Sequence, residues 1–348
     1  MTDNGCTSVE RGLKVEYGKL GRSNLTVSKA CLGTMHFGPY ASEEESFAIM
    51  DRALEMGINF WDTANVYGGS GAHGRSEEII GRWFAARPGK RDQVVLATKV
   101  YNPMVETIVP NEERGFSAYK VRKHLSDSLR RLQTDHIDLY QVHHIDRRVA
   151  PEEFWGTLEN VVAGGDVLYV GSSNFPGWGL AKFQMQALSR GFLGLVSKQT
   201  MYSLVCRAPE LEVLPAALDF GIGILAYMPL AGGLLTGKLR SLESSRTAQV
   251  EAEYGIKLGP ENQQFAAFSA LCRELGEKEH VVAIAWTLNH PALASAIVGV
   301  RTVQQLDGLE RATELKLGDE VMAKLDGIFS INRGRPLRSG PAPEAYAW

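Results

Sequence analysis

The sequence has few cysteines, and no two of them are spaced as a metal-binding or redox pair would be. Only four occur among 348 residues, at positions 6, 31, 206 and 272, without a Cys-x-x-Cys motif. Such scattered cysteines argue against a disulfide framework and against a zinc site, and they suit a reducing compartment. We therefore expect a cytoplasmic protein without a bound metal.

Long hydrophobic runs and a strong excess of one charge are also missing. No apolar run approaches the roughly 20 residues that a membrane span needs, and the N-terminus lacks the apolar stretch of a signal peptide. The net charge of −3 gives no polyanion-binding signature. The basic residues between 120 and 131 are interleaved with apolar residues at helical spacing, which predicts a solvated helix face. Neither a membrane nor a nucleic acid is an expected partner, and the choice between monomer and homo-oligomer stays open.

What the chain does contain is a regular alternation of strand and helix patterns. Hydrophobic residues make up 44% of it, enough for a large core. Each predicted strand is followed by a helical pattern. The strands fall at residues 30–34, 59–62, 94–99, 137–143, 167–171, 195–199, 222–227 and 295–300. Eight strand-then-helix units in this order predict an α/β fold, a (β/α)8 TIM barrel.

Several segments extend this repeat. Residues 15–29 predict a β-hairpin that could plug the barrel floor, and extra helices are expected near the C-terminus. We expect one domain over residues 1–348, with tails at 1–14 and about 331–348. Finer expectations concern single elements: a helix over 210–220, and capping boxes at Ser42 with Glu45 and Thr302 with Gln305. A long loop at 101–116 is expected to be functional or mobile, and a second long segment at 236–260 shows little pattern.

Three consecutive predicted strands end in ionisable residues. These are Asp62, Lys99 and His143, and Tyr67 follows Asp62 by five residues. One such residue alone is more often a solvated strand end or a core histidine. Neighbouring parallel strands, however, lie about 4.8 Å apart and end at the same edge, so the four side chains should converge. The sequence predicts an acid–base centre, with His144 on the opposite face of its strand.

In their local sequences, Asp62, Tyr67, Lys99 and His143 resemble the catalytic tetrad of the aldo-keto reductases. The resemblance runs from about residue 15 to 329 and includes residues 171–175 and 226–238. It implies an NADP(H)-dependent oxidoreductase that reduces a carbonyl or conjugated enone by hydride transfer. Tyr67 would be the general acid, and His143 would orient the substrate. Asp62 would hold Lys99 beside Tyr67, and the charge of Lys99 should lower the pKa of Tyr67.

The resemblance also implies which residues bind NADP. Ser173, Asn174 and Gln199 match the residues that hold the nicotinamide carboxamide, and Tyr227 matches the one that stacks on its ring. The loop 230–238 should cover the pyrophosphate, and Arg301 suits the 2′-phosphate. The remaining implied cofactor positions are Pro229, Leu230, Gly233, Leu235, Lys238, Gly299 and Gln305. Gln305 fits a helix cap equally well.

Two motifs point to other enzyme classes. Gly69, Gly71 and Gly74 match the GxGxxG pattern, but a Rossmann turn follows directly on its strand. Here the insert that carries Tyr67 intervenes, which argues against that interpretation. Ser172 and Ser173 lack the GxSxG pattern of a hydrolase nucleophile.

Within the family, residues 143–147, 169–174 and 211–217 are most similar to the reductases of actinobacterial deoxysugar pathways. That similarity implies a keto-deoxysugar linked to a nucleoside diphosphate, or its enone, as the small-molecule substrate. The cations for its diphosphate would be Arg147, Arg148, Arg333, Arg335 or Arg338. Three alternatives remain: a general aldehyde or ketone reductase, an alcohol dehydrogenase, and a redox-sensing regulatory subunit like the potassium-channel β subunits, which share the barrel and tetrad.

Overall fold

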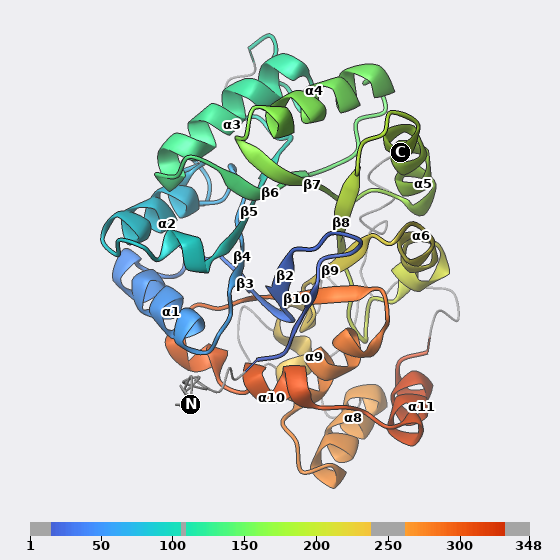
Figure 1. Ribbon diagram of the computed structural model, residues 1–348. Helices are drawn as coiled ribbons and strands as arrows, with labels where there is room; N and C mark the ends of the chain where they lie inside the picture. The colour runs from blue at the N-terminus through green and yellow to red at the C-terminus, as the bar shows by residue number, and fades with distance from the viewer. Residues whose placement is uncertain (1–14, 106–108, 238–261, 331–348) are drawn as a thin grey trace, which may run out of the picture.

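A computed structural model describes residues 15–105, 109–237 and 262–330. Its centre is a closed barrel of eight parallel strands in the order β10-β3-β4-β5-β6-β7-β8-β9 (Figure 1). The strands are β3 (Ala30–Gly33), β4 (Phe60–Asp62), β5 (Val95–Val100), β6 (Ile137–Val142), β7 (Val167–Ser173), β8 (Leu195–Met201), β9 (Gly223–Tyr227) and β10 (Leu293–Gly299). The predicted (β/α)8 barrel is confirmed, and strand ends differ from the prediction by one or two residues.

Helices surround the barrel, as Figure 1 shows. They are α1 (Glu43–Glu55), α2 (Arg75–Ala85), α3 (Ala118–Leu132), α4 (Pro151–Ala163), α5 (Gly177–Ser189), α6 (Val213–Phe220), α8 (Gln263–Glu274), α9 (Glu279–Asn289), α10 (Leu309–Glu314) and α11 (Asp319–Ile328). Short 3-10 helices are η1 (Arg91–Gln93), η2 (Ala208–Leu211), η3 (Ala231–Thr236) and η5 (Val303–Leu306). Within the three described ranges, none of the helices combines the length and apolarity that crossing a membrane requires.

The barrel floor is closed by the predicted hairpin. Strands β1 (Tyr17–Lys19) and β2 (Thr26–Ser28) pair antiparallel, and β2 lies at the centre of the ring in Figure 1. Leu20 and Val27 are fully buried there, in a cluster with inward-facing strand residues such as Phe60 and Leu139. This cluster fills the barrel interior next to the hairpin. The polar strand ends face the other mouth, at the C-terminal ends of the strands.

The predicted single helix over 210–220 is wrong. The chain forms η2 and then α6, with a break at Glu212, whose φ and ψ are −145° and −49°. Pro215 has no N–H for a helical hydrogen bond, so it fits only in the first turn of a helix, and the restart at Val213 places it there. The break also turns the Glu212 carboxylate toward α5, where it accepts the Trp178 N–H at 2.7 Å.

The predicted capping box at Thr302 and Gln305 is also wrong. The Thr302 side chain makes no capping hydrogen bond, and Gln305 Oε1 instead accepts the Arg301 N–H at 2.7 Å. Glu45 Oε1 accepts the Val303 N–H at 2.9 Å, because α1 packs beside η5. The carboxylate of Glu45, which is distant in sequence, therefore caps the start of η5 in place of the Thr302 side chain.

Candidate active site

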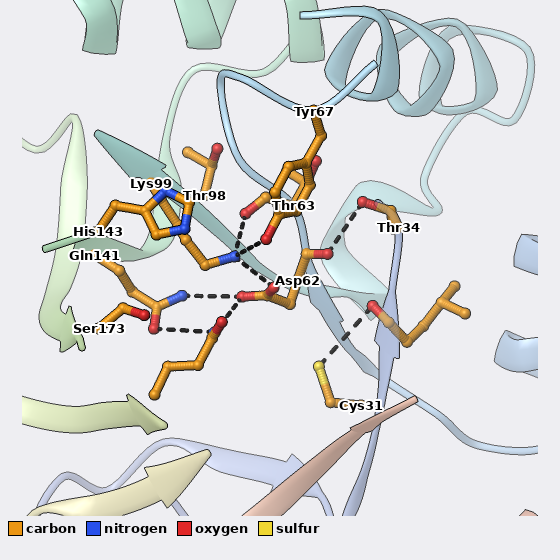
Figure 2. Close-up of polar contacts among 12 residues, drawn as sticks. Cys31, Thr34, Asp62, Thr63, Tyr67, Thr98, Lys99, Gln141, His143 and Ser173 are labelled. Carbon is orange, nitrogen blue, oxygen red and sulfur yellow. Dashed lines mark hydrogen bonds and ion pairs between the residues drawn. The ribbon is translucent and has the colours of Figure 1, made fainter. Parts of the chain in front are cut away.

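The C-terminal ends of β4, β5 and β6 bring the four predicted acid–base residues together. Asp62 is the last residue of β4, Lys99 lies near the end of β5, and His143 follows β6 directly. The His143 N–H donates to the Val100 carbonyl at 3.0 Å, which continues the strand pairing past the end of β6. Figure 2 shows Lys99 between Asp62 and Tyr67, with His143 beside them.

Lys99 is the centre of this group. Its ammonium donates to Asp62 Oδ2 at 2.6 Å, to the Thr63 carbonyl at 2.9 Å and to Tyr67 Oη at 3.0 Å. The Lys99 side chain is fully buried. Burial by itself would lower its pKa, but the Asp62 charge and the Tyr67 oxygen raise it above the ordinary lysine value. Lys99 is therefore a fixed cation whose three hydrogens are all committed.

Tyr67 is held by the glycine-rich segment that follows it. Its carbonyl accepts the N–H groups of Gly74 at 3.1 Å and Ser76 at 3.2 Å, which fastens the loop to the start of α2. The path requires glycine at position 68, where φ is 144° and a Cβ would lie 2.0 Å from the Ala72 oxygen. The N–H groups that a Rossmann turn would offer to a phosphate thus position Tyr67.

The expected lowering of the Tyr67 pKa is wrong. The desolvation of its hydroxyl raises the pKa above the ordinary tyrosine value, and the Lys99 charge only partly offsets this effect. The phenol is therefore protonated at neutral pH. Because Lys99 donates to Oη, the hydroxyl hydrogen can point toward a substrate.

His143 is a neutral imidazole at neutral pH. Burial, helped by the charge of Lys99, holds its pKa well below the ordinary histidine value. Its ring meets the Tyr67 ring edge-on, with 6.3 Å between centroids. A neutral ring keeps one N–H donor, which suits it to hold a carbonyl oxygen near Tyr67.

Strand alternation predicted that His144 lies on the opposite face from His143, and this prediction is wrong. The two rings stack, with centroids 5.2 Å apart and planes 19° apart. Strand β6 ends at Val142, so alternation no longer applies to the residues after it. Burial, helped by the charge of Arg114, lowers the pKa of His144 to about 4, so this ring is also neutral.

Two glutamines hold the second oxygen of Asp62, and one of them was not predicted. Asp62 Oδ1 accepts the amide N–H of Gln141 at 3.0 Å and of Gln199 at 2.8 Å. Gln199 was expected among the residues that hold the nicotinamide carboxamide. Gln141 lies on β6 two residues before His143, and that spacing places both on the inner face of the strand. This spacing is the signal that could have identified Gln141.

The residues assigned to the nicotinamide lie next to the acid–base group. Asn174 Nδ2 donates to Ser173 Oγ and to the His143 carbonyl, both at 3.1 Å. Tyr227 Oη donates to Asn174 Oδ1 at 3.0 Å. Asn174 has a φ of 55°, a left-handed conformation that asparagine tolerates well. Ser173, Asn174 and Tyr227 therefore form one hydrogen-bonded group at the ends of β7 and β9.

The loop assigned to the pyrophosphate follows β9. Gly232 and Gly233 have φ values of 66° and 105° inside η3, and this left-handed path suits glycine. Pro229 and Leu230 lead into η3, while the Leu235 side chain is fully buried in the core, so only its backbone could contact a cofactor. Lys238 and residues 239–260 lie outside the described residues.

The residues assigned to the adenosine end lie after β10. The Arg301 guanidinium stacks on the Tyr40 ring, 4.6 Å from its centroid. Gly299 is the last residue of β10, where a Cβ would lie 3.3 Å from the His36 ring. The Gln305 side-chain oxygen accepts the Arg301 backbone N–H at 2.7 Å, so it is already engaged within the protein.

Residues of α3 anchor the long β5–α3 loop. Of the basic residues expected on a solvated face, Arg122, Lys123 and Arg130 are exposed, but Lys120 is buried. Lys120 is 2% exposed and donates to the carbonyls of Tyr101 at 2.7 Å and Glu113 at 2.6 Å. Burial lowers its pKa to about 8. His124, also buried, lies 3.0 Å from Glu112 Oε2 on one side and 3.0 Å from Asn65 Nδ2 on the other. The described parts of this loop are thereby linked to the segment that carries Tyr67.

Comparisons with known proteins agree with this geometry. The model of the Aldo/keto reductase family matches residues 29–329. The chain is 51% identical to the uncharacterized oxidoreductase YrpG of Bacillus subtilis over 336 residues, covering 96% of this chain and 100% of that protein. It is 32% identical to the versiconal hemiacetal acetate reductase of Aspergillus parasiticus, covering 90% and 96%, and 32% identical to the norsolorinic acid reductase stcV of Emericella nidulans, covering 90% and 81%.

Proposed function

Because the chain belongs to the aldo/keto reductase family, we propose that it reduces a carbonyl group or a conjugated enone with NADPH. The observation that carries the proposal is the Lys99 ammonium, which bridges the Asp62 carboxylate and the Tyr67 phenol beside a neutral His143. A protonated acid, a fixed cation and a neutral hydrogen-bond donor at the mouth of a barrel are what a carbonyl reduction needs.

The side chains divide the work of the reaction. When bound, NADPH supplies the hydride. His143 donates a hydrogen bond to the substrate oxygen and orients it. Tyr67 gives its proton to that oxygen as negative charge develops there, and Lys99 stabilises the charge left on Oη from 3.0 Å. Asp62 keeps Lys99 in place through the 2.6 Å ion pair.

The nicotinamide end of the site fits such a cofactor. A carboxamide needs both donors and acceptors, and Ser173, Asn174 and Gln199 together supply hydroxyl and amide groups at adjacent strand ends. Tyr227 is half-buried, and its hydroxyl is tied to Asn174, so its ring is fixed in orientation. The fit supports a nicotinamide cofactor, and the choice of NADP rests on Arg301.

Arg301→Ala should weaken NADPH binding far more than NADH binding, since only NADPH carries the 2′-phosphate. A charge-assisted contact to phosphate predicts a loss of at least ~10-fold for NADPH. Fluorescence titration with both cofactors measures this difference, and Tyr40→Phe is the matched control because it keeps the ring on which Arg301 stacks. Equal losses for the two cofactors would remove Arg301 from 2′-phosphate recognition.

For the substrate, we propose a keto-deoxysugar linked to a nucleoside diphosphate. Arg147, in the loop after β6, stacks on the partly exposed Trp178 with 5.0 Å to its ring centroid, and such a cation at the barrel mouth suits a diphosphate. The neighbouring Arg148 pairs with Asp146 at 3.1 Å. Arg333, Arg335 and Arg338 lie outside the described residues.

A plain or aromatic carbonyl compound is the second candidate. The relatives named as reductases of versiconal hemiacetal acetate and of norsolorinic acid carry no sugar nucleotide in their names. The exposed apolar side chains of Met35, in the loop after β3, and of Trp178, in the first turn of α5, also suit an apolar substrate. This candidate keeps the same acid–base chemistry and changes only the contacts at the barrel mouth.

Steady-state kinetics decide between the two candidates. NADPH oxidation is followed with a nucleoside-diphosphate 4-keto-2,6-dideoxyhexose, its 2,3-enone, and a panel of aliphatic and aromatic aldehydes. The sugar nucleotide should show a kcat/KM at least ~10-fold higher, the size of one charge-assisted contact. A value no better than that of a plain aromatic aldehyde would end the sugar-nucleotide assignment, and no turnover with any carbonyl would end the proposed reaction.

A further inference from the structure

Gln141 joins the acid–base group to the residues assigned to the nicotinamide. It is fully buried on β6, beside Lys99 in the strand register. Its amide nitrogen donates to Asp62 Oδ1, as Figure 2 shows, and its amide oxygen lies 3.4 Å from the amide nitrogen of Gln199. Gln199 also donates to Asp62 Oδ1, so the three side chains close a hydrogen-bonded ring.

The direction of each hydrogen bond in this ring is fixed by Asp62. Asp62 carries the negative charge of the ion pair with Lys99, and an ionised carboxylate only accepts hydrogen bonds. Both glutamines must therefore turn their amide nitrogens toward it. The second N–H of Gln199 then points at the Gln141 oxygen. The Gln199 oxygen is left facing away from Asp62, as the acceptor for a ligand.

The space for Gln141 is built into the neighbouring strand. Position 171 on β7, which pairs with Gln141, is glycine. A Cβ there would lie 3.2 Å from Gln141 Cγ and 2.3 Å from Ser197 Oγ. Because residue 171 has no side chain, the Gln141 side chain has room beside β7 to reach Asp62.

We propose that Gln141 is a positioning residue that sets the orientation of the Gln199 amide, and through it that of the nicotinamide, relative to Asp62 and Lys99. The inference rests on the proposed function, because it takes Gln199 as a ligand of the carboxamide. Gln141 touches neither substrate nor cofactor in this scheme. It acts by donating a hydrogen bond to Asp62 Oδ1 and by accepting the second N–H of Gln199. The second of these bonds keeps the Gln199 side-chain amide from flipping its nitrogen and oxygen.

Two substitutions at this position separate positioning from simple packing. Gln141→Met keeps the length of the side chain but removes both hydrogen bonds, so the NADPH dissociation constant should rise about 5-fold or more, the size of one lost hydrogen bond. Gln141→Glu places a second carboxyl against Asp62 Oδ1. Two carboxyls in contact share a proton at low pH and repel each other once it is lost.

The pH profile of Gln141→Glu tests the positioning role, because a residue that only fills space would not give NADPH binding a new pH dependence. Its NADPH affinity and kcat should stay near the wild-type values at about pH 5.5, then fall as the pH rises, in a step that the wild type and Gln141→Met lack. The other titratable groups around this position are Cys31, Asp62, Tyr67, Lys99 and His143. The wild type contains all of them, so a step seen only in Gln141→Glu belongs to the new carboxyl.

Gln184→Glu is the matched control. Gln184 is equally buried, but its amide bonds the backbone of Leu193 and Leu195 at the far end of β8. This variant should lose thermal stability without changing the NADPH dissociation constant or its pH dependence. If Gln141→Glu is unfolded above neutral pH, circular dichroism will show it, and Gln141→Met then decides alone.

The wild-type arm tests the proposed function separately. If the wild type fails to bind NADPH in the fluorescence titration, the proposed function is wrong and this inference falls with it. If the wild type binds and reduces carbonyls but Gln141→Met matches its dissociation constant and kcat, the positioning role is wrong while the proposed function stands. A Gln141→Glu profile that parallels the wild type would overturn the role in the same way.

Discussion

Tyr67→Phe is expected to lower kcat for carbonyl reduction by at least ~100-fold, the scale of general acid catalysis. Tyr67 Oη already accepts a hydrogen bond from Lys99, so its own hydrogen is the one aimed at the substrate. Phenylalanine keeps the ring against His143 and removes only the proton donor. Since the protonated phenol is the active form and its pKa lies above the ordinary value, the reduction rate of the wild type should fall only at alkaline pH.

Cofactor binding separates this effect from general damage to the site. The Tyr67 hydroxyl is not one of the groups assigned to the carboxamide, so the NADPH dissociation constant of Tyr67→Phe should be nearly unchanged. Tyr140→Phe is the matched control, because the Tyr140 hydroxyl is buried on the outer side of β6 without a hydrogen-bond partner in the described structure. Turnover by Tyr67→Phe close to that of Tyr140→Phe would remove Tyr67 from the mechanism.

The fold was predictable because each level of the sequence agrees with the next. The barrel strands are buried on both faces, so apolar runs such as 94–97 mark them, and helical patterns separate them. In a parallel barrel every strand ends at the same mouth, so ionisable residues at successive strand ends had to meet. Asp62 and Lys99 were therefore predictable as a pair without any knowledge of side-chain contacts.

The polar residues that support the site were not predictable in this way. Lys120, His124, Ser128 and Arg131 recur at helical spacing on α3, which resembles a solvated stripe in the sequence. They face inward because Glu77, on α2, accepts from Ser128 and Arg131, and because loop carbonyls accept from Lys120. These partners lie far away in the sequence, so only the tertiary structure reveals that the stripe is buried.

The error on Tyr67 has a physical cause of the same kind. Sequence reasoning gave the sign of the Lys99 effect on the Tyr67 pKa correctly, because that effect follows from proximity alone. The opposing effect of desolvation depends on how deeply the barrel mouth encloses the hydroxyl, and it proves larger. Burial of this kind is set by loops whose packing the sequence pattern does not specify.

The second large effect concerns the ion pair between Lys99 and Asp62. Both side chains are almost completely buried, with Nζ and Oδ2 2.6 Å apart. Removing one partner of a buried pair leaves an uncompensated charge, which typically costs about 3–5 kcal/mol of stability. Lys99→Met should therefore lower the free energy of unfolding by about this amount, and it should also abolish most activity because Tyr67 loses its cation.

The double variant Asp62→Asn/Lys99→Met makes the prediction specific. It removes both charges and keeps similar volumes, so it should be more stable than Lys99→Met alone even though it carries one substitution more. Arg131→Met is the comparison at a distance, since it breaks the 2.8 Å pair with the fully buried Glu77 and should cost stability while kcat persists. Calorimetric unfolding at pH 7 ranks the variants. If Lys99→Met were more stable than Asp62→Asn/Lys99→Met, Asp62 would not be a buried charge that depends on Lys99. The acid–base centre would then need another source for its cation.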